Sequence, residues 1–325
     1  MKYILFVLVM AFGSFSALAQ DAEFQEMLRR AESGDAEAQS NLGRRYANGT
    51  DASINYQEAV KWFRLAAEQG DATGQNGLGV MYSDGTGVAK NGQEALKWYR
   101  LAAEQGDATA QSNLGVMYQR GEGVAQSDQE AVKWYRLAAE QGDAAAQSIL
   151  GFMYLNGDGV AQNYQEAMQW LRLAAEQGDA TAQSNLGFMY LNGEGVAQNY
   201  QEAMQWLRLA AEQGDARAQS NLGVMYQRGE GVAQSDQEAV KWYRLAAEQG
   251  RANAQFNLGV MYLNGTGVAQ NYQRAYVWFS VAAAQGLDDA TINRDIVSER
   301  LTPQALEQAQ AQATRCFDSN YQDCE

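Results

Sequence analysis

Apolar residues recur at helical spacing along most of the chain, in paired stretches that are separated by short loops containing glycine. In the first pair, Ala38, Leu42 and Tyr46 share one face of the first stretch, and Ala59 and Trp62 belong to one face of the second. This spacing is typical of amphipathic helices, whose apolar faces must be buried against a partner. The pattern therefore predicts pairs of helices that pack face to face.

The pairs are copies of a single 36-residue unit. Residues 110–142 recur without a change as residues 218–250, three units further along the chain. Such a short unit cannot bury its apolar face alone and gains stability by stacking on its neighbours. A capping helix is expected at residues 20–33, and capping helices with a cysteine-containing tail at residues 286–325. Between them we expect seven contiguous copies, at residues 34–69, 70–105, 106–141, 142–177, 178–213, 214–249 and 250–285.

Recurrent polar residues and glycines mark the helix ends. An aspartate such as Asp35 precedes the first helix of each copy and is expected to cap it, except in the last copy, where Arg251 takes the position. A glycine such as Gly49 is expected to end that helix. A Ser-x-x-Glu pattern, as in Ser127 and Glu130, predicts a capping box at the start of the second helix.

Each copy also carries a glycine in the middle of its first helix and a tryptophan in its second. Glycine costs about 1 kcal/mol of helix stability relative to alanine, so we expect these glycines to permit close approach of the second helix. A tryptophan column can form a ligand-binding stripe, but one ring per copy on a core-facing position is typical of packing. The columns are Gly43, Gly79, Gly115, Gly151, Gly187, Gly223 and Gly259, and Trp62, Trp98, Trp134, Trp170, Trp206, Trp242 and Trp278.

Composition and charge exclude several classes of function. The net charge is −15, from 24 basic and 39 acidic residues without a basic stripe, so we expect no nucleic-acid partner. The chain has no histidine, which removes Ser-His and Cys-His nucleophiles, and it has no Ser-x-x-Lys motif. Carboxylate pairs could still hydrolyse glycosides, but the carboxylates recur at the same cap and surface positions in copy after copy. We predict no enzymatic activity, no cofactor and no metal site.

The N-terminal residues predict export. Residues 1–19 have the three-part layout of a secretory signal peptide, with Lys2, an apolar run and small residues ending at Ala19. The apolar run is shorter than the roughly 20 residues that a membrane-spanning helix needs. We therefore expect cleavage after Ala19 and a periplasmic or secreted protein without a membrane span.

The C-terminal residues predict a closing helix and a covalent clasp. Thr302 followed by Pro303 is typical of a helix start, with threonine as the cap and proline in the first turn. Cys316 and Cys324 are the only cysteines. In an oxidising compartment we expect a disulfide between them, with two free thiols as the alternative.

Three sequence elements occur together in nearly every copy: Ala-x-Ala-Gln-x-x-Leu-Gly-x-x-Tyr, Gly-x-Gly-Val and Ala-x-x-Trp-x-x-x-Ala-Ala. In this combination residues 34–285 resemble the Sel-one-like repeat family, which is related to the tetratricopeptide repeats. The resemblance implies an all-α fold, a right-handed α/α superhelix or solenoid of helix-turn-helix repeats with capping helices at its ends. It also implies a scaffold or adaptor in protein complexes. Some exported members carry two cysteines in every repeat and have been labelled β-lactamases, whereas these repeats contain no cysteine.

Matching Leu42, Gly43 and Tyr46 to a tetratricopeptide repeat implies which positions line a concave wall. The columns that begin at Arg44 and Ala47 then form an apolar patch centred on the fourth and fifth copies. We expect this patch to bind a partner, with asparagines holding a peptide backbone; the alternative is that the same side chains pack between neighbouring first helices. The candidate binding residues are Val116, Arg120, Phe152, Leu155, Phe188, Leu191, Val224, Arg228, Asn113, Asn185 and Asn221.

Together these observations favour a non-catalytic protein–protein interaction scaffold or adaptor of the bacterial cell envelope, which acts as a monomer and binds a protein or peptide partner in its concave groove. The alternative is a cell-wall or polysaccharide-associated binding protein or hydrolase. Sugar binding requires exposed aromatic rings, whereas nearly all aromatic rings of this sequence are assigned to the core.

Overall fold

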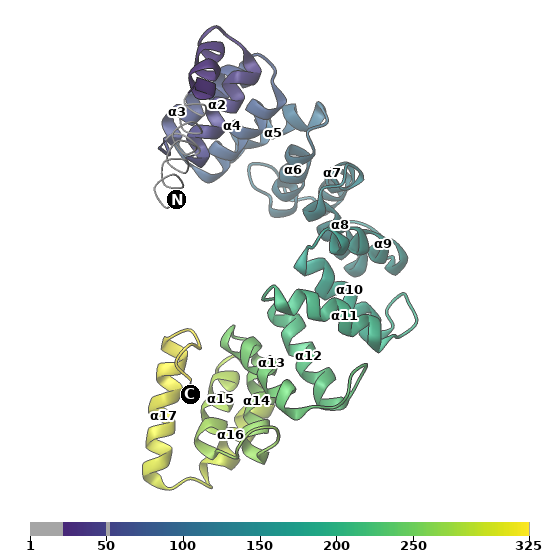
Figure 1. The fold of residues 1–325 in the computed structure, drawn as a ribbon, viewed down its shortest axis with the longest axis vertical. Coiled ribbons are helices and arrows are strands. Elements are labelled where there is room, and N and C mark those ends of the chain that lie inside the picture. The colour runs from purple at the N-terminus through teal and green to yellow at the C-terminus, as the bar shows by residue number, and fades with distance from the viewer. Residues whose placement is uncertain (1–21, 50–52, 325) are drawn as a thin grey trace, which may run out of the picture. The chain divides into compact units, whose positions relative to one another are not determined.

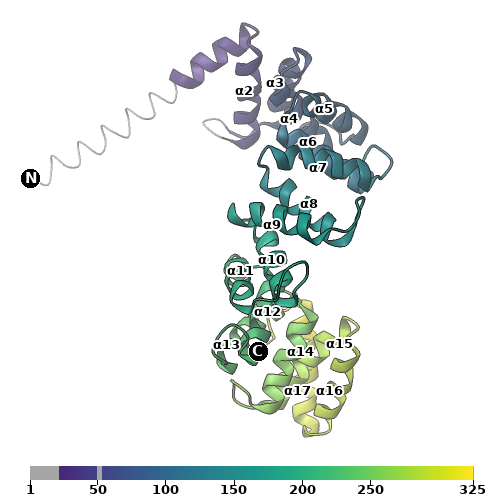
Figure 2. The same ribbon diagram turned by 90° about the vertical axis from the view of Figure 1, so that its right-hand side faces the viewer.

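A computed structural model describes residues 22–49 and 53–324. These residues form two compact units; the first ends at Gln162 and the second begins at Asn163, between the two helices of the fourth copy. All regular secondary structure in the described residues is helical, and the repeat helices of each unit pack side by side in sequence order (Figures 1 and 2). The predicted class, an all-α solenoid of helix-turn-helix repeats, is confirmed. The predicted signal peptide, residues 1–19, lies outside the described residues.

In the first unit a helix over residues 22–32, the expected capping helix, precedes the repeats. The helices that follow are α2 (Ala36–Asn48), α3 (Tyr56–Glu68), α4 (Ala72–Asp84), α5 (Gly92–Glu104), α6 (Ala108–Arg120), α7 (Asp128–Glu140) and α8 (Ala144–Asn156). The second unit contains α9 (Tyr164–Glu176), α10 (Ala180–Asn192), α11 (Tyr200–Glu212), α12 (Ala216–Arg228), α13 (Asp236–Glu248), α14 (Ala252–Asn264), α15 (Tyr272–Ala284), α16 (Asp288–Ser298) and α17 (Pro303–Asp318). No helix in the described ranges is both long and apolar enough to cross a membrane.

Side-chain caps begin the helices as the sequence predicts. Asp143 accepts a hydrogen bond from the backbone N–H of Ala146 at 2.7 Å, and the equivalent aspartates cap α2, α4, α6, α10 and α12 in the same way. Arg251 gives α14 no side-chain cap. Only one of the two hydrogen bonds of the predicted capping box is present. Ser127 accepts from the N–H of Glu130 at 3.3 Å, whereas the Glu130 carboxylate pairs with Lys133 and does not bond back to Ser127.

The mid-helix glycines let the two helices of a repeat approach closely. A β-carbon on Gly223 in α12 would lie 2.5 Å from the Tyr243 ring of α13, and one on Gly115 in α6 would lie 2.7 Å from the Tyr135 ring of α7. Contacts this short are repulsive, so only glycine fits. The predicted reason for the glycine column is therefore confirmed here and at Gly43, Gly79, Gly187 and Gly259.

A ladder of buried glutamines joins neighbouring repeats. The Nε2 of Gln75 in α4 donates to the carbonyl oxygen of Ala67 in the preceding repeat at 3.3 Å, and its Oε1 accepts from Gln105 at the end of α5 at 2.7 Å. Each such glutamine bridges three helices, and because its donor and acceptor are both satisfied, its burial fixes the stacking register. The ladder repeats at Gln39, Gln111, Gln183, Gln219 and Gln255.

The second glycine of each loop is required by the repeat that precedes it. A β-carbon on Gly231 would lie 2.3 Å from the carbonyl oxygen of Tyr200, the first residue of α11. The φ of Gly231 is 69°, in the region that favours glycine. The first copy has no preceding repeat, which explains why its loop sequence lacks this glycine.

The C-terminal helix α17 closes the stack by packing on α15 (Figure 1). It begins as predicted, with Thr302 accepting from the N–H of Ala305 at 3.2 Å and Pro303 in the first turn. On α15 the face that α17 covers is apolar: Val277 is buried at the position where α3, α5, α7 and α13 carry an exposed lysine. The exchange of lysine for valine marks where the repeat array ends.

Cys316 and Cys324 form the expected disulfide, with their Cα atoms 4.4 Å apart. The residues that the disulfide encloses contact the turn between α13 and α14. Gln322 donates to the carbonyl oxygen of Glu248 at 2.9 Å, and the Tyr321 ring leaves no room for a β-carbon on Gly250. The disulfide thus fastens the closing helix to the sixth and seventh copies.

Candidate binding wall

The predicted binding residues lie on the first helices of the repeats, and each unit contains its own share of them. We call the surface of α10, α12 and α14 that carries two neighbouring columns, one of asparagines and one of apolar residues, the first-helix wall of the second unit. The asparagine column is Asn185, Asn221 and Asn257, and the apolar column is Phe188, Val224 and Val260.

In the first unit the apolar candidates differ in exposure. Phe152 in α8 is 39% exposed, whereas Leu155 on the same helix is 8% exposed and therefore buried. Val116 in α6 is half-buried. Leu155 is therefore not accessible to a partner, whereas Phe152 is the most exposed apolar candidate of this unit.

In the second unit an arginine partly covers the wall. The guanidinium carbon of Arg217 in α12 lies 4.3 Å from the centre of the Phe188 ring in α10, a cation–π contact, and its Nη1 donates to Oδ1 of Asn185 at 2.8 Å. Phe188 and Leu191 are half-buried, whereas Asn185 is 2% exposed. The side chain of Asn185 is thus bonded within the wall, whereas the Phe188 ring contacts Arg217 on one side and is partly exposed to solvent.

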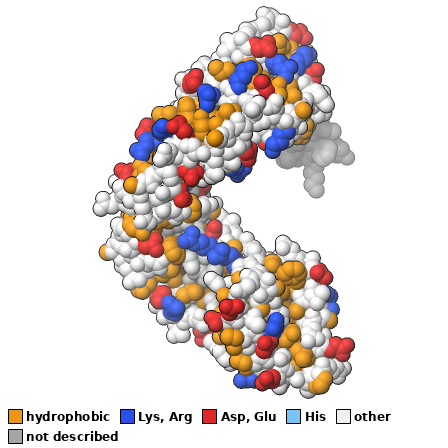
Figure 3. Space-filling model, turned by 180° about the vertical axis from the view of Figure 1, so that it is seen from behind, with side chains coloured by type: hydrophobic (Ala, Val, Ile, Leu, Met, Phe, Trp, Pro, Cys, Tyr) orange, Lys and Arg blue, Asp and Glu red, His pale blue; other side chains and the backbone are white. Residues whose placement is uncertain are grey.

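The valines of the apolar column also contribute to the core. Val224 and Val260 pack against the buried cluster around Tyr243, Leu258 and Phe279, yet both remain partly exposed. Binding surface and inter-repeat packing are therefore compatible roles for this column. On the face seen in Figure 3, hydrophobic side chains form small patches separated by polar and charged ones.

The charge of Arg217 is held in a half-buried setting. Burial lowers the pKa of its guanidinium; among the neighbouring charges Asp215 opposes this shift, Arg251 reinforces it and Glu194 opposes it. One helical turn further on, the Nδ2 of Asn221 is buried and has no hydrogen-bond acceptor among the described residues. This part of the wall therefore holds a partly desolvated cation beside an unused donor.

The remaining polar candidates have weaker or internal contacts. Arg120 and Arg228 are exposed and face Glu122 and Glu230, with 3.7 Å between nitrogen and oxygen in both pairs, a geometry that contributes little at a surface. Asn113 donates to Oδ1 of the asparagine at position 76 at 3.1 Å. Both arginines thus remain accessible at the surface, whereas Asn113 is half-buried and bonded within the first unit.

The tryptophan column does not form an exposed stripe. Trp62 and Trp278 are buried and the other rings are half-buried. In six copies the indole nitrogen is buried without an acceptor in the described residues, so these rings serve packing: Trp62, Trp98, Trp170, Trp206, Trp242 and Trp278.

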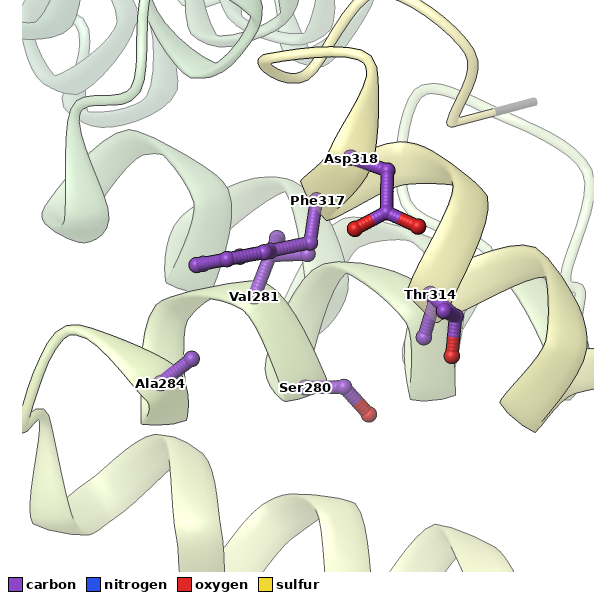
Figure 4. A pocket seen from close by; sticks show the side chains of 7 residues that line it. Ser280, Val281, Ala284, Thr314, Phe317 and Asp318 are labelled. Atoms are coloured by element: carbon purple, nitrogen blue, oxygen red, sulfur yellow. The ribbon is translucent and has the colours of Figure 1, made fainter.

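A separate pocket of about 250 Å³ lies between α15 and α17. Phe317, which is 52% exposed, extends from α17 across Val281 of α15, with Asp318 and Thr314 at the rim (Figure 4). Within the described residues no three His, Cys, Asp or Glu side chains gather as a metal site would require.

Repeated helix pairs and glutamine-linked stacking define a helical-repeat protein. The sequence profile of the Sel1 repeat matches residues 36–71, 72–107, 108–143, 144–179, 180–215, 216–250 and 252–287. The chain belongs to the Sel1 repeat family, whose members are generally protein-interaction scaffolds. The resemblance seen in the sequence is confirmed.

Solved structures of the family are similar to this chain. A Sel1 repeat protein from Oxalobacter formigenes is 36% identical with a TM-score of 0.68, and the match covers 75% of this chain and 96% of that protein. A protective antigen present in uropathogenic Escherichia coli strains is 33% identical with a TM-score of 0.44, covering 92% of this chain and 79% of that protein. No curated protein matches the chain.

Proposed function

We propose that this chain is a non-catalytic scaffold of the cell envelope that binds a protein partner on the first-helix wall of its second unit. One observation carries the proposal: asparagines and apolar side chains occupy neighbouring columns without interruption across α10, α12 and α14. Amide groups suit the polar backbone of a peptide, and apolar side chains suit its side chains.

The apolar column alone supports only weak binding. Fully burying three exposed side chains of this kind would contribute about 5–9 kcal/mol, and less here because all three are already half-buried, whereas association costs about 4–15 kcal/mol. Polar contacts must therefore contribute, and the wall offers Asn221, Asn257 and Arg228 for them. In the first unit, the exposed Phe152 is a second candidate contact.

Two features support an envelope location. The predicted signal peptide at residues 1–19 directs export, and the Cys316–Cys324 disulfide is of the kind that an oxidising compartment maintains. Absence of histidine from the whole sequence supports a non-catalytic role, because it removes the commonest general base near neutral pH.

Affinity capture from the cells that produce the chain tests the proposal. Phe188→Glu places a charge in the apolar column, so it should abolish capture of the partner that the wild-type chain retains. The matched control is Leu209→Glu, because Leu209 is 45% exposed on α11, away from the wall. Both variants should keep wild-type helicity by circular dichroism. Retention of the partner by Phe188→Glu, or equal loss in both variants, would contradict the proposal.

A further inference from the structure

Two arginines flank a segment of the sixth copy whose twin in the third copy has none. Residues 218–250 are identical to residues 110–142, but the residue before the segment changes from Thr109 to Arg217 and the one after it from Asp143 to Arg251. Both exchanges add positive charge to a chain with a net charge of −15. The third copy thus provides the same 33-residue segment without the two flanking arginines.

Both arginines lie at the starts of neighbouring first helices. Arg217 is in the first turn of α12 and Arg251 directly precedes α14, which contacts α12. Arg217 is half-buried and Arg251 is exposed. They are close enough for the charge of Arg251 to lower the pKa of Arg217.

Structural roles account for only part of these exchanges. Asp143 caps its helix, whereas Arg251 leaves α14 without a side-chain cap. Arg217 stacks on Phe188 and uses a single N–H to bond Asn185. In the described part of the chain neither arginine forms an ion pair with a carboxylate.

The two acids nearest to Arg217 accept hydrogen bonds from other groups and form no ion pair with it. Asp215 accepts from the N–H of Ala218 at 2.6 Å and from the Ser184 hydroxyl at 2.9 Å. Glu194 accepts from the side-chain amide of the asparagine at position 192 at 3.4 Å. The remaining guanidinium donors of Arg217, which stacks on Phe188, and those of Arg251 are therefore open to an acceptor from outside.

Resting on the proposed function, we propose that Arg217 and Arg251 bind carboxylates of an acidic segment in the partner protein, while Phe188 and Val224 receive an apolar side chain from the same segment. A guanidinium matches a carboxylate with two parallel N–H bonds, and a half-buried guanidinium is screened less by salt than an exposed one. The partner segment is thus expected to alternate acidic and apolar residues.

Fluorescence anisotropy with defined peptides tests this proposal on the full mature chain. The probe is a fluorescein-labelled peptide of alternating glutamate and phenylalanine, and its match carries glutamine in place of glutamate. The glutamate peptide should bind about tenfold more tightly at low salt, and this preference should shrink as salt is added.

Charge-matched variants locate the effect. Arg217→Gln with Arg251→Gln should remove the preference, whereas Lys133→Gln with Lys241→Gln removes the same charge from exposed sites on the second helices α7 and α13 and should retain it. Arg251→Asp removes the positive charge and restores the missing side-chain cap of α14. It should therefore weaken binding of the glutamate peptide while raising the melting temperature, so unfolding cannot explain the weaker binding.

Four results would overturn the proposal: no binding of the glutamate peptide, equal binding of the glutamine peptide, equal losses in the two double variants, or displacement by inorganic phosphate as effective as by unlabelled peptide. Partner capture that depends on Phe188 and is unchanged by Arg217→Gln with Arg251→Gln would overturn it while leaving the proposed function intact.

Discussion

The contact between each mid-helix glycine and the side chain facing it decides how closely the two helices of a repeat can pack. At Gly223 this contact belongs to Tyr243, which is fully buried and whose hydroxyl donates to Gln227 at 2.8 Å. Burial raises the pKa of the Tyr243 phenol, so it stays protonated and keeps this bond at neutral and mildly alkaline pH. Glycine is required here because the Tyr243 ring leaves no room for a β-carbon, although glycine lowers the stability of the helix.

Gly223→Ala should therefore lower the free energy of unfolding, by up to about 2 kcal/mol in a urea titration. Alanine gains about 1 kcal/mol of helix propensity, but overpacking against the Tyr243 ring costs about 1–3 kcal/mol. In a Tyr243→Ala background the ring is gone, and the same exchange should become neutral or stabilising. Equal losses in both backgrounds would show that the ring is not the reason for glycine.

Residue-level predictions from the sequence succeed where the partner is local. Asp143 caps a helix three residues away and Pro303 begins one, so both were readable from spacing alone. The Gln75–Gln105 ladder and the Arg217–Phe188 contact join residues about thirty positions apart. Their geometry depends on how repeats stack, which no local pattern specifies, and the one available signal was the departure of Arg217 from its column.

At the scale of elements, the closing helix α17 packs on α15, the second helix of the seventh copy. Val277 and Val281 of α15 are buried, whereas the residues at the same positions of earlier second helices are exposed. The disulfide holds the tail against the turn between α13 and α14. The sequence predicted this helix and its clasp, but not the face it covers. The lysine-to-valine exchange at position 277 was the readable signal for that face.

Replacing Cys316 and Cys324 by serine should loosen this end of the second unit. Opening a loop with a sequence separation of 8 removes about 2–3 kcal/mol of unfolded-state restraint. Amide hydrogen exchange should accelerate in α15 and α17 and stay unchanged in α4 to α6, and reduction of the wild-type chain should give the same result. Unchanged exchange in α17 would show that packing on α15 alone holds the helix.

At the scale of the whole molecule, the residues that fix the stacking of the repeats and most of those proposed to bind a partner occupy different columns of one repeated sequence. Leu42, Gln39 and their counterparts are buried and satisfied, and they stay constant along the array. Changes between copies collect at positions such as Phe152, Arg217 and Arg251, on or beside the first-helix surfaces. The repeat period revealed the fold, whereas the proposed site for an acidic segment, at Arg217 and Arg251, is located by departures from that period.

The central claim, that a protein partner occupies the first-helix wall of the second unit, is tested most directly by site-specific photo-cross-linking in the cells that produce the chain. A photoreactive phenylalanine analogue at position 188 should form one dominant cross-linked product with a protein, and the same analogue at position 209 of α11 should not. Arg217→Gln with Arg251→Gln should reduce that product without changing the amount of chain. Cross-linking at position 209 as strong as at 188, or no protein product from position 188, would contradict the account.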